Sequence, residues 1–176
     1  MQLLLQAQLT LEEIHVSKLT KVTVAVVLKK SIDSDEFLVV RRPKEDSDLA
    51  DSWGFPAVTL LPGELPEQGA QRVCREKLGC NAKATRYLGI MFQERNNYDI
   101  FLMDIEMVLD EGEVADVAKA NTTHTAYSEQ VWSTDPMIME PSAKAGSCCA
   151  SIFMTDRGVL DKDEWVKSLE GSSIVG

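Results

Sequence analysis

The sequence predicts one α+β domain in which a mixed or antiparallel β-sheet is flanked by helices. Three observations predict this fold class. Short apolar, β-branched runs bounded by turn residues are typical of strands. Segments with helix start and stop residues follow them. The chain has 176 residues, 44% of them apolar, which suits one sizeable core. The domain is expected to span 1–176, with 1–20 as a helical extension and 171–176 as a frayed tail.

The first elements are predicted in chain order as a helix and a hairpin. Residues 10–13, Thr-Leu-Glu-Glu, have the capping-box pattern and open a short helix through about residue 19. Residues 21–28 are apolar and β-branched, which predicts a buried strand. A second strand is predicted over 36–42, and the turn residues 31–35 between the two strands indicate a hairpin.

The middle of the chain predicts a long loop over 43–61, a helix and two more strands. The helix is expected from about Pro66 to Leu78, because proline suits a first turn and Gly79 a stop position. Strands over 85–92 and 99–109 are joined by an Asn-Asn turn. In the second strand, alternation places four apolar residues on one face and two acids on the other. These are Phe101, Met103, Ile105 and Met107, and Asp104 and Glu106.

The last third of the sequence is predicted to contain a loop, one strand and helices. Residues 111–125 are acidic and polar, which indicates a surface loop. A strand is expected over 127–132, and helical structure begins again at 134–136. The main C-terminal helix is predicted over 142–154, and a last helix over 161–169.

Composition excludes some functions. A net charge of −10 argues against binding to a nucleic-acid polymer, which requires a basic face. No apolar run approaches the roughly 20 residues that cross a bilayer, so we expect no membrane partner and a cytoplasmic location. The four cysteines form no Cys-x-x-Cys pair, which favours buried, reduced thiols over a zinc site.

The most informative segment surrounds the predicted helix. It carries Trp53-x-Phe55-Pro56, the pair Gly63-Glu64, the helix start Pro66-Glu67, then Arg72 and Gly79. This spacing resembles the Nudix box, a loop–helix–loop motif written G-x5-E-x7-R-E-U-x-E-E-x-G-U, where U is aliphatic. The box covers residues 58–80, and the order of the surrounding strands extends the resemblance to most of the chain.

The resemblance implies an α/β/α sandwich with a Nudix-type mixed sheet. Members that are enzymes hydrolyse a nucleoside diphosphate linked to another group. Glutamates of the box helix bind Mg²⁺ or Mn²⁺, which polarises the diphosphate and activates water. Carboxylates one helical turn apart share a face and give a hard cation its oxygen ligands.

The departures from the motif fall on the metal-binding positions. Val58 stands at the opening glycine, and Val73 replaces the first glutamate of the helix. Glu76 is retained, but Lys77 replaces the glutamate that follows it. A lysine about 5 Å from a divalent ion costs about 6–7 kcal/mol at an effective dielectric near 20. Mg²⁺ or Mn²⁺ is therefore expected to bind weakly.

A second register of the motif is also open. Glu67, Arg75 and Glu76 satisfy E-x7-R-E three residues further along the same helix. This register places Leu61 at the opening glycine and Gly79 at a metal-binding glutamate, and it loses the match around Trp53. The first register is preferred.

Two acids are the candidate catalytic and metal-binding residues. Glu76 is interpreted either as the surviving ligand or as an exposed helix residue paired with Arg72. Glu64 is either a second ligand or an acid that favours the start of the helix. Glu94 and Glu129 are candidates for a distal ligand, with surface charge as the alternative.

Three residues are the candidate substrate-binding groups. Arg42 ends the second strand, where its guanidinium suits bidentate contact with a phosphate. Lys77 either replaces the missing cation and contacts a phosphate or is a solvated surface lysine. Phe92 either stacks on a base or packs in the core.

The expected function is binding of a nucleotide or other diphosphate-containing ligand, with weak or absent hydrolysis. The first alternative is an active Mg²⁺- or Mn²⁺-dependent pyrophosphohydrolase. The second is a structural or interaction module. A homodimer is a possible partner state, and the substrate is not encoded in the box.

Overall fold

The computed structural model describes residues 18–46, 49–121 and 126–161. Seven strands lie in this part of the chain: β1 (Leu19–Lys29), β2 (Phe37–Arg41), β3 (Trp53–Gly54), β4 (Ala57–Thr59), β5 (Ala82–Glu94), β6 (Tyr98–Leu109) and β7 (Glu129–Ser133). The helices are α2 (Pro66–Leu78), α3 (Glu140–Lys144) and α4 (Cys148–Asp156), with 3₁₀ turns at Val117–Lys119 and Pro136–Met139.

The strands form one mixed sheet with β1 at its centre. On one side β1 pairs antiparallel with β2 and β4, and β2 carries β3 and β7. On the other side β1 runs parallel to β6, from Leu19 opposite Tyr98 to Lys29 opposite Val108. β5 is antiparallel to β6 and forms the edge of the sheet. The mixed sheet confirms the predicted fold class.

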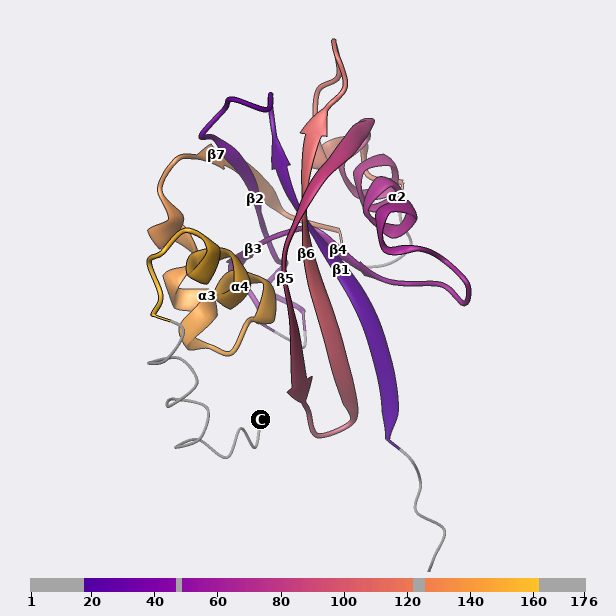
Figure 1. Ribbon diagram of the computed structural model, residues 1–176, viewed down its shortest axis with the longest axis vertical. Helices are drawn as coiled ribbons and strands as arrows, with labels where there is room; N and C mark the ends of the chain where they lie inside the picture. Colours follow the sequence, from indigo (N-terminus) through magenta and orange to yellow (C-terminus); the bar gives the residue numbers. More distant parts are fainter. Residues whose placement is uncertain (1–17, 47–48, 122–125, 162–176) are drawn as a thin grey trace, which may run out of the picture.

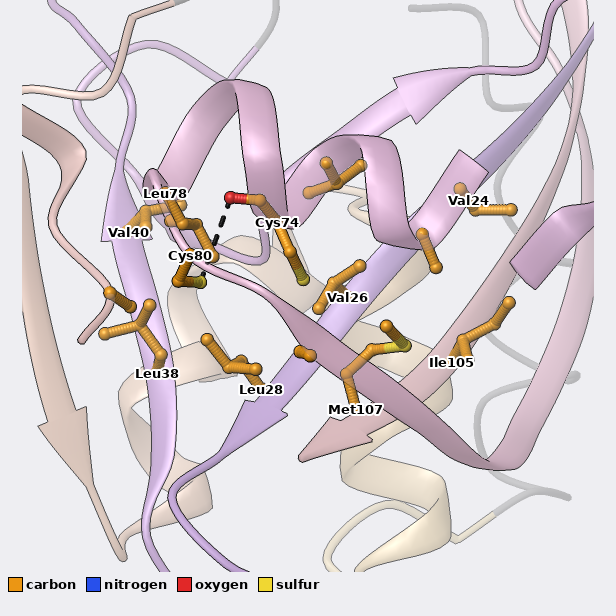
Figure 2. Close-up of a cluster of buried hydrophobic side chains, with 14 of the residues drawn as sticks. Val24, Val26, Leu28, Leu38, Val40, Cys74, Leu78, Cys80, Ile105 and Met107 are labelled. Carbon is orange, nitrogen blue, oxygen red and sulfur yellow. Dashed lines mark hydrogen bonds between the residues drawn. The ribbon is translucent and has the colours of Figure 1, made fainter. Parts of the chain in front are cut away.

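Helices cover both faces of the sheet, which confirms the α/β/α sandwich. Figure 1 shows α2 on one side and α3 and α4 on the other. Alternate residues of β1 enter two separate cores: Val24, Val26 and Leu28 pack under α2, whereas Ala25 and Val27 pack under α4. Burial on both faces explains why the strand sequence is apolar throughout. Figure 2 shows the core under α2.

Helix α2 has the bounds predicted from the sequence. Pro66 occupies the first turn, and the side chain of Gln68 accepts the amide hydrogen of Leu65 at 2.9 Å. Gly79 ends the helix with φ +61°, a left-handed conformation that glycine adopts without strain. A stripe of side chains at helical spacing faces the sheet. Its members are Gly69, Ala70, Val73, Cys74, Lys77 and Leu78.

Three sequence predictions require correction. The expected loop 43–61 contains β3 and β4, because its apolar residues pair with β2 and β1. The expected helix 142–154 is two helices, since Gly146 turns the chain with φ +88° and Ser147 caps α4. Lys18 is not helical and Leu19 belongs to β1, whereas residues 10–17 of the predicted first helix lie outside the described residues. The predicted 161–169 helix and the 171–176 tail lie outside them too, except Asp161.

The β5–β6 hairpin forms as expected, and β6 buries residues on both of its faces. Met103, Ile105 and Met107 face α2, and Asp104 and Glu106 lie on the opposite face. Both acids are nevertheless buried, because α4 covers that part of the sheet. Beyond the end of α2 the sheet exposes apolar side chains on three adjacent strands. These are Val22, Ile90, Phe92 and Phe101.

In the described part of the chain, no helix has the length and apolar character needed to cross a membrane.

Candidate functional site

The buried side of α2 places Lys77 beside Tyr127, a residue just before β7. Lys77 is 7% exposed, and its Nζ lies 3.5 Å from the hydroxyl oxygen of Tyr127 and 5.2 Å from the ring centroid. The Tyr127 hydroxyl also accepts the amide hydrogen of Ala57 at 3.2 Å. The interpretation of Lys77 as a solvated surface lysine is therefore wrong.

The position of Lys77 follows from helix geometry. It is four residues after Val73 and seven after Ala70, so all three lie on the stripe that faces the sheet. Val73 is 1% exposed and belongs to the apolar core under α2. The two motif positions that have lost their glutamates thus share one buried face, occupied by a valine and an ammonium.

Burial shifts the pKa values of Lys77 and Tyr127 in opposite directions. Removal from water lowers the pKa of Lys77 to about 8, and the nearby positive charge of Arg42 acts in the same direction. Burial raises the pKa of Tyr127 to about 12, so its hydroxyl remains protonated near neutral pH. At pH 7 the face therefore carries a positive charge beside a neutral phenol.

Glu64 lies at the start of α2 and is engaged by Arg72. Arg72 donates from Nε and Nη2 to the two carboxylate oxygens of Glu64, at 2.8 and 2.7 Å. The amide hydrogen of Leu61 adds a contact of 2.9 Å, and Arg72 also donates to the carbonyl of Thr59 at 3.0 Å. The hydrogen bond from Arg72 holds the pKa of Glu64 below its usual value. The Glu64–Arg72 pair therefore attaches the loop between β4 and α2 to the helix α2.

Glu76 has the environment of an exposed helix residue. Its side chain is 45% exposed, and its carboxylate lies 3.6 Å from Nη1 of Arg72, one turn earlier. The predicted i, i+4 pair is thus present, although Arg72 makes its shorter contacts with Glu64. The backbone carbonyl of Glu76 accepts the amide hydrogen of Asn121, which fixes the end of the helix.

The other substrate-binding candidates lie on different sides of β1. Arg42 follows β2, contacts Asp46 at 3.0 Å and is close enough to Lys77 to influence its pKa. Phe92 is on the edge strand β5, 48% exposed and 4.8 Å from the ring centroid of Phe101. Three strand spacings, about 14 Å, separate β5 from β4. The fold brings Arg42 to Lys77 but leaves Phe92 distant.

The residues present do not fit a divalent metal ion. Glu64 and Glu76 both pair with Arg72, and the two buried motif positions supply no carboxylate. Within 18–46, 49–121 and 126–161, no three His, Cys, Asp or Glu side chains gather closely enough to hold a metal. Glu129, a candidate distal ligand, lies 3.4 Å from Arg41.

Two further features were not assigned a place from the sequence. Tyr127 is the hydrogen-bond partner of Lys77. The sequence signal for it is an aromatic residue two positions before β7, the strand that pairs with β2. A shallow pocket of about 360 Å³ lies between Lys30, Trp132 and residues 109–115, and it includes none of the candidate residues.

The fold and the site together define a class of protein. It is an α/β/α domain whose loop–helix–loop segment, residues 58–80, lies across the central strand of a mixed sheet. Residues 19–130 match the NUDIX domain family, and the chain belongs to that family.

Solved structures show the same fold at low sequence identity. The solution structure of the E. coli ORF135 protein matches with a TM-score of 0.60 at 21% identity, covering 84% of this chain and 97% of that one. The MutT protein from Methanosarcina mazei Go1 gives 0.59 at 15%, over 81% and 96%. A NUDIX hydrolase from Nitrosomonas europaea gives 0.61 at 20%, over 79% and 88%. No curated protein matches the chain.

Proposed function

We propose that this chain binds a nucleotide or another diphosphate-containing ligand beside Lys77, with weak or absent hydrolysis. The observation that carries the proposal is the buried ammonium of Lys77, which occupies the inward face of α2 at a motif position for glutamate. A fixed cation there attracts phosphate oxygens directly. In related enzymes a metal ion, held by carboxylates, attracts the phosphate oxygens.

The groups around Lys77 suit an anionic ligand. An ammonium has three N–H donors, and in the described part of the chain its hydrogen-bond partner is the Tyr127 hydroxyl at 3.5 Å. Donors therefore remain for phosphate oxygens. Arg42 adds a second positive charge, and a guanidinium forms paired hydrogen bonds with phosphate. The two cations would hold a diphosphate between β2 and α2.

Hydrolysis is expected to be weak because the metal that activates water has few ligands. A bound divalent ion lowers the pKa of its water and polarises the phosphoryl oxygen. Glu64 and Glu76 are the remaining acids of the motif, and both contact Arg72. Mg²⁺ or Mn²⁺ would have to displace Arg72 from at least one of them and approach a buried ammonium.

An active Mg²⁺- or Mn²⁺-dependent pyrophosphohydrolase is the second candidate. Family membership supports it, as does the likeness in fold to a NUDIX hydrolase and a MutT protein. In this function Glu76 and Glu64 are the catalytic and metal-binding residues, and Lys77 turns away from the ion.

An interaction role, including homodimer formation, is favoured by the exposed Phe92 and Phe101 pair. Sedimentation of the full chain tests it, and a monomer at every concentration counts against it.

Calorimetric titration of the full chain with ADP and with inorganic pyrophosphate in EDTA tests the first proposal. We expect both anions to bind without metal and Lys77→Met to weaken binding about tenfold or more, because it removes the buried charge. Lys83→Met is the matched control, since Lys83 is an exposed lysine whose side chain is 81% accessible. Binding that requires added metal, or that is equal in both variants, overturns the proposal.

A further inference from the structure

Two cysteines lie in contact beneath the end of α2. Gly79 turns the chain back, and the amide hydrogens of Gly79 and Cys80 both reach the carbonyl oxygen of Cys74. The Cys80 bond is 3.2 Å long, and the Cys80 Sγ lies 3.8 Å from the same oxygen (Figure 2). The turn therefore folds Cys80 back onto the last turns of the helix.

This contact brings the two residues within reach of a disulfide. Standard geometry places Cα about 1.5 Å from its own N and about 2.4 Å from its own carbonyl oxygen. With the 3.2 Å hydrogen bond between Cys80 N and Cys74 O, the two Cα atoms are about 7 Å apart at most. Ordinary hydrogen-bond angles shorten that separation, and disulfides form at Cα spacings of roughly 4.4–6.8 Å.

The thiols themselves also interact. A hydrogen bond between the two side chains holds the pKa of Cys80 below its ordinary value. The Cys80 thiol, which donates to the Cys74 carbonyl oxygen, is therefore deprotonated more easily than an ordinary cysteine thiol, and the thiolate is the form that a peroxide oxidises.

We propose that Cys74 and Cys80 are a thiol oxidation site that closes to an intramolecular disulfide when the chain meets a peroxide. The Cys80 thiolate attacks one peroxide oxygen and breaks the O–O bond; with one proton taken up, this gives a sulfenic acid and one water. The Cys74 sulfur then attacks the Cys80 sulfur, and the hydroxyl leaves as a second water with the thiol proton. The two thiols together lose two protons and two electrons, and these reduce one hydrogen peroxide to two waters.

The location of the pair explains what the bond would do. Cys74 lies in α2, and Cys80 precedes β5, so the bond closes the seven-residue segment 74–80 around the end of the helix. Both thiols are buried, and the amide hydrogen of Asp116 binds the carbonyl oxygen of Leu78 at the end of the helix. A small oxidant therefore enters when the last turn of α2 opens locally. This inference does not depend on the proposed function.

Cys148 and Cys149 provide an internal comparison. They are also buried, but they are neighbours in sequence, and a bond between adjacent residues is strained. Burial raises the pKa of Cys148 to about 11 and raises that of Cys149 as well. We expect these two thiols to stay reduced under conditions that oxidise the Cys74–Cys80 pair.

Peptide mapping of the full chain after treatment with hydrogen peroxide tests the site. Folded protein is oxidised, remaining thiols are alkylated under denaturing conditions, and trypsin is added without reductant. Trypsin cleaves after Arg72, Arg75, Lys77 and Lys83, so the two cysteines fall on different peptides. The expected product is peptide 73–75 joined to peptide 78–83, with Cys148 and Cys149 recovered alkylated. The joined peptide is expected to form about tenfold faster than any loss of those two thiols.

Variants make the outcome decisive. Cys148→Ser with Cys149→Ser should form the joined peptide at the wild-type rate, whereas Cys80→Ser should form none. Near-ultraviolet circular dichroism checks that each variant is folded before oxidation. Recovery of Cys74 and Cys80 as alkylated thiols from oxidised, folded wild type overturns the proposal. Overoxidation of Cys80 to a sulfonic acid without the joined peptide also overturns it.

Discussion

The ammonium of Lys77 lies 3.5 Å from the hydroxyl oxygen of Tyr127, and both side chains are buried between α2 and the sheet. A charge removed from water with one long hydrogen bond destabilises the folded chain. The same charge, at a motif position for glutamate, is the group that the proposed anionic ligand would contact. The stability of this domain and the ligand binding that we propose would therefore depend on the same atom.

Lys77→Met is expected to raise the free energy of unfolding at pH 7 by about 1–3 kcal/mol. The pKa of Lys77 is about 8 in the folded chain against 10.5 ordinarily. Between these values the unfolded chain binds more protons, so wild-type stability increases as pH rises. The difference in the free energy of unfolding between the variant and wild type should therefore decrease from pH 7 to about pH 10.5. Urea denaturation of both proteins across this range measures it, and a constant difference contradicts the burial of a charged Lys77.

Val73→Glu with Lys77→Glu is expected to restore affinity for Mn²⁺. The change places two carboxylates one turn apart on the face of α2 and removes the cation that repels the ion. Calorimetry should show Mn²⁺ affinity at least about tenfold above wild type. Without metal the double variant should be less stable, because two acids are then buried. No gain in affinity counts against the motif register in which Val73 and Lys77 replace glutamates.

Glu64→Gln is expected to lower the free energy of unfolding by about 1–2 kcal/mol at pH 7, because it weakens a partly buried, doubly hydrogen-bonded pair with Arg72. The pKa of Glu64 is lowered in the folded chain, so its contribution is present above 4.5 and is lost as pH falls below that value. Urea denaturation at pH 7 and near pH 3 measures both effects.

The control for this variant is Glu36→Gln. Glu36 pairs with Lys30 at 2.7 Å, but both side chains are at least 40% exposed. Exposed pairs contribute about 0–1 kcal/mol, so the control should change stability little. Equal effects of the two variants would show that Glu64 does not fix the loop to α2.

Asp104→Asn is expected to stabilise the domain at neutral pH by about 1–3 kcal/mol, because it removes a buried acid. Neither carboxyl oxygen of Asp104 has a hydrogen-bond partner among the described residues. Burial raises the pKa of Asp104 far above its usual value, and the negative charge of Asp156 on α4 adds to the shift.

The sign of the pH dependence follows from that shift. The folded chain binds more protons than the unfolded chain above pH 3.8, so wild-type stability falls as pH rises. The advantage of Asp104→Asn should therefore be small near pH 4 and larger at pH 8. Thermal unfolding at the two pH values checks this, and an advantage that is largest in acid refutes it.

The fold was largely predictable because local chemistry agrees with the global arrangement. Pro66 and Gly79 bound α2 in the sequence as they do in the structure. The apolar run of β1 indicates burial on both faces, and both faces are covered. The break between α3 and α4 was missed because the apolar residues continue across Gly146, and periodicity alone does not show where a chain turns.

The site was less predictable, for a physical reason. The interpretation of Lys77 as solvated followed the usual exposure of lysine, but its spacing from Ala70 and Val73 places it on the buried stripe. The position of Lys77 along the helical repeat, rather than its residue type, therefore determines that it is buried. Tyr127 lies just before β7 and contacts Lys77, and Arg42 lies just after β2 and acts on Lys77 through its charge, so both come from segments distant in sequence. Such contacts depend on the sheet order, which the motif does not encode.

Titration of the wild-type full chain with Mn²⁺ and Mg²⁺, followed by assay of nucleoside diphosphates, triphosphates and dinucleotides, tests the central claim most directly. We predict no stoichiometric metal binding at α2 and little or no metal-dependent release of phosphate or nucleotide. Tight binding of one Mn²⁺, with robust turnover that Glu76→Gln abolishes, would contradict the account.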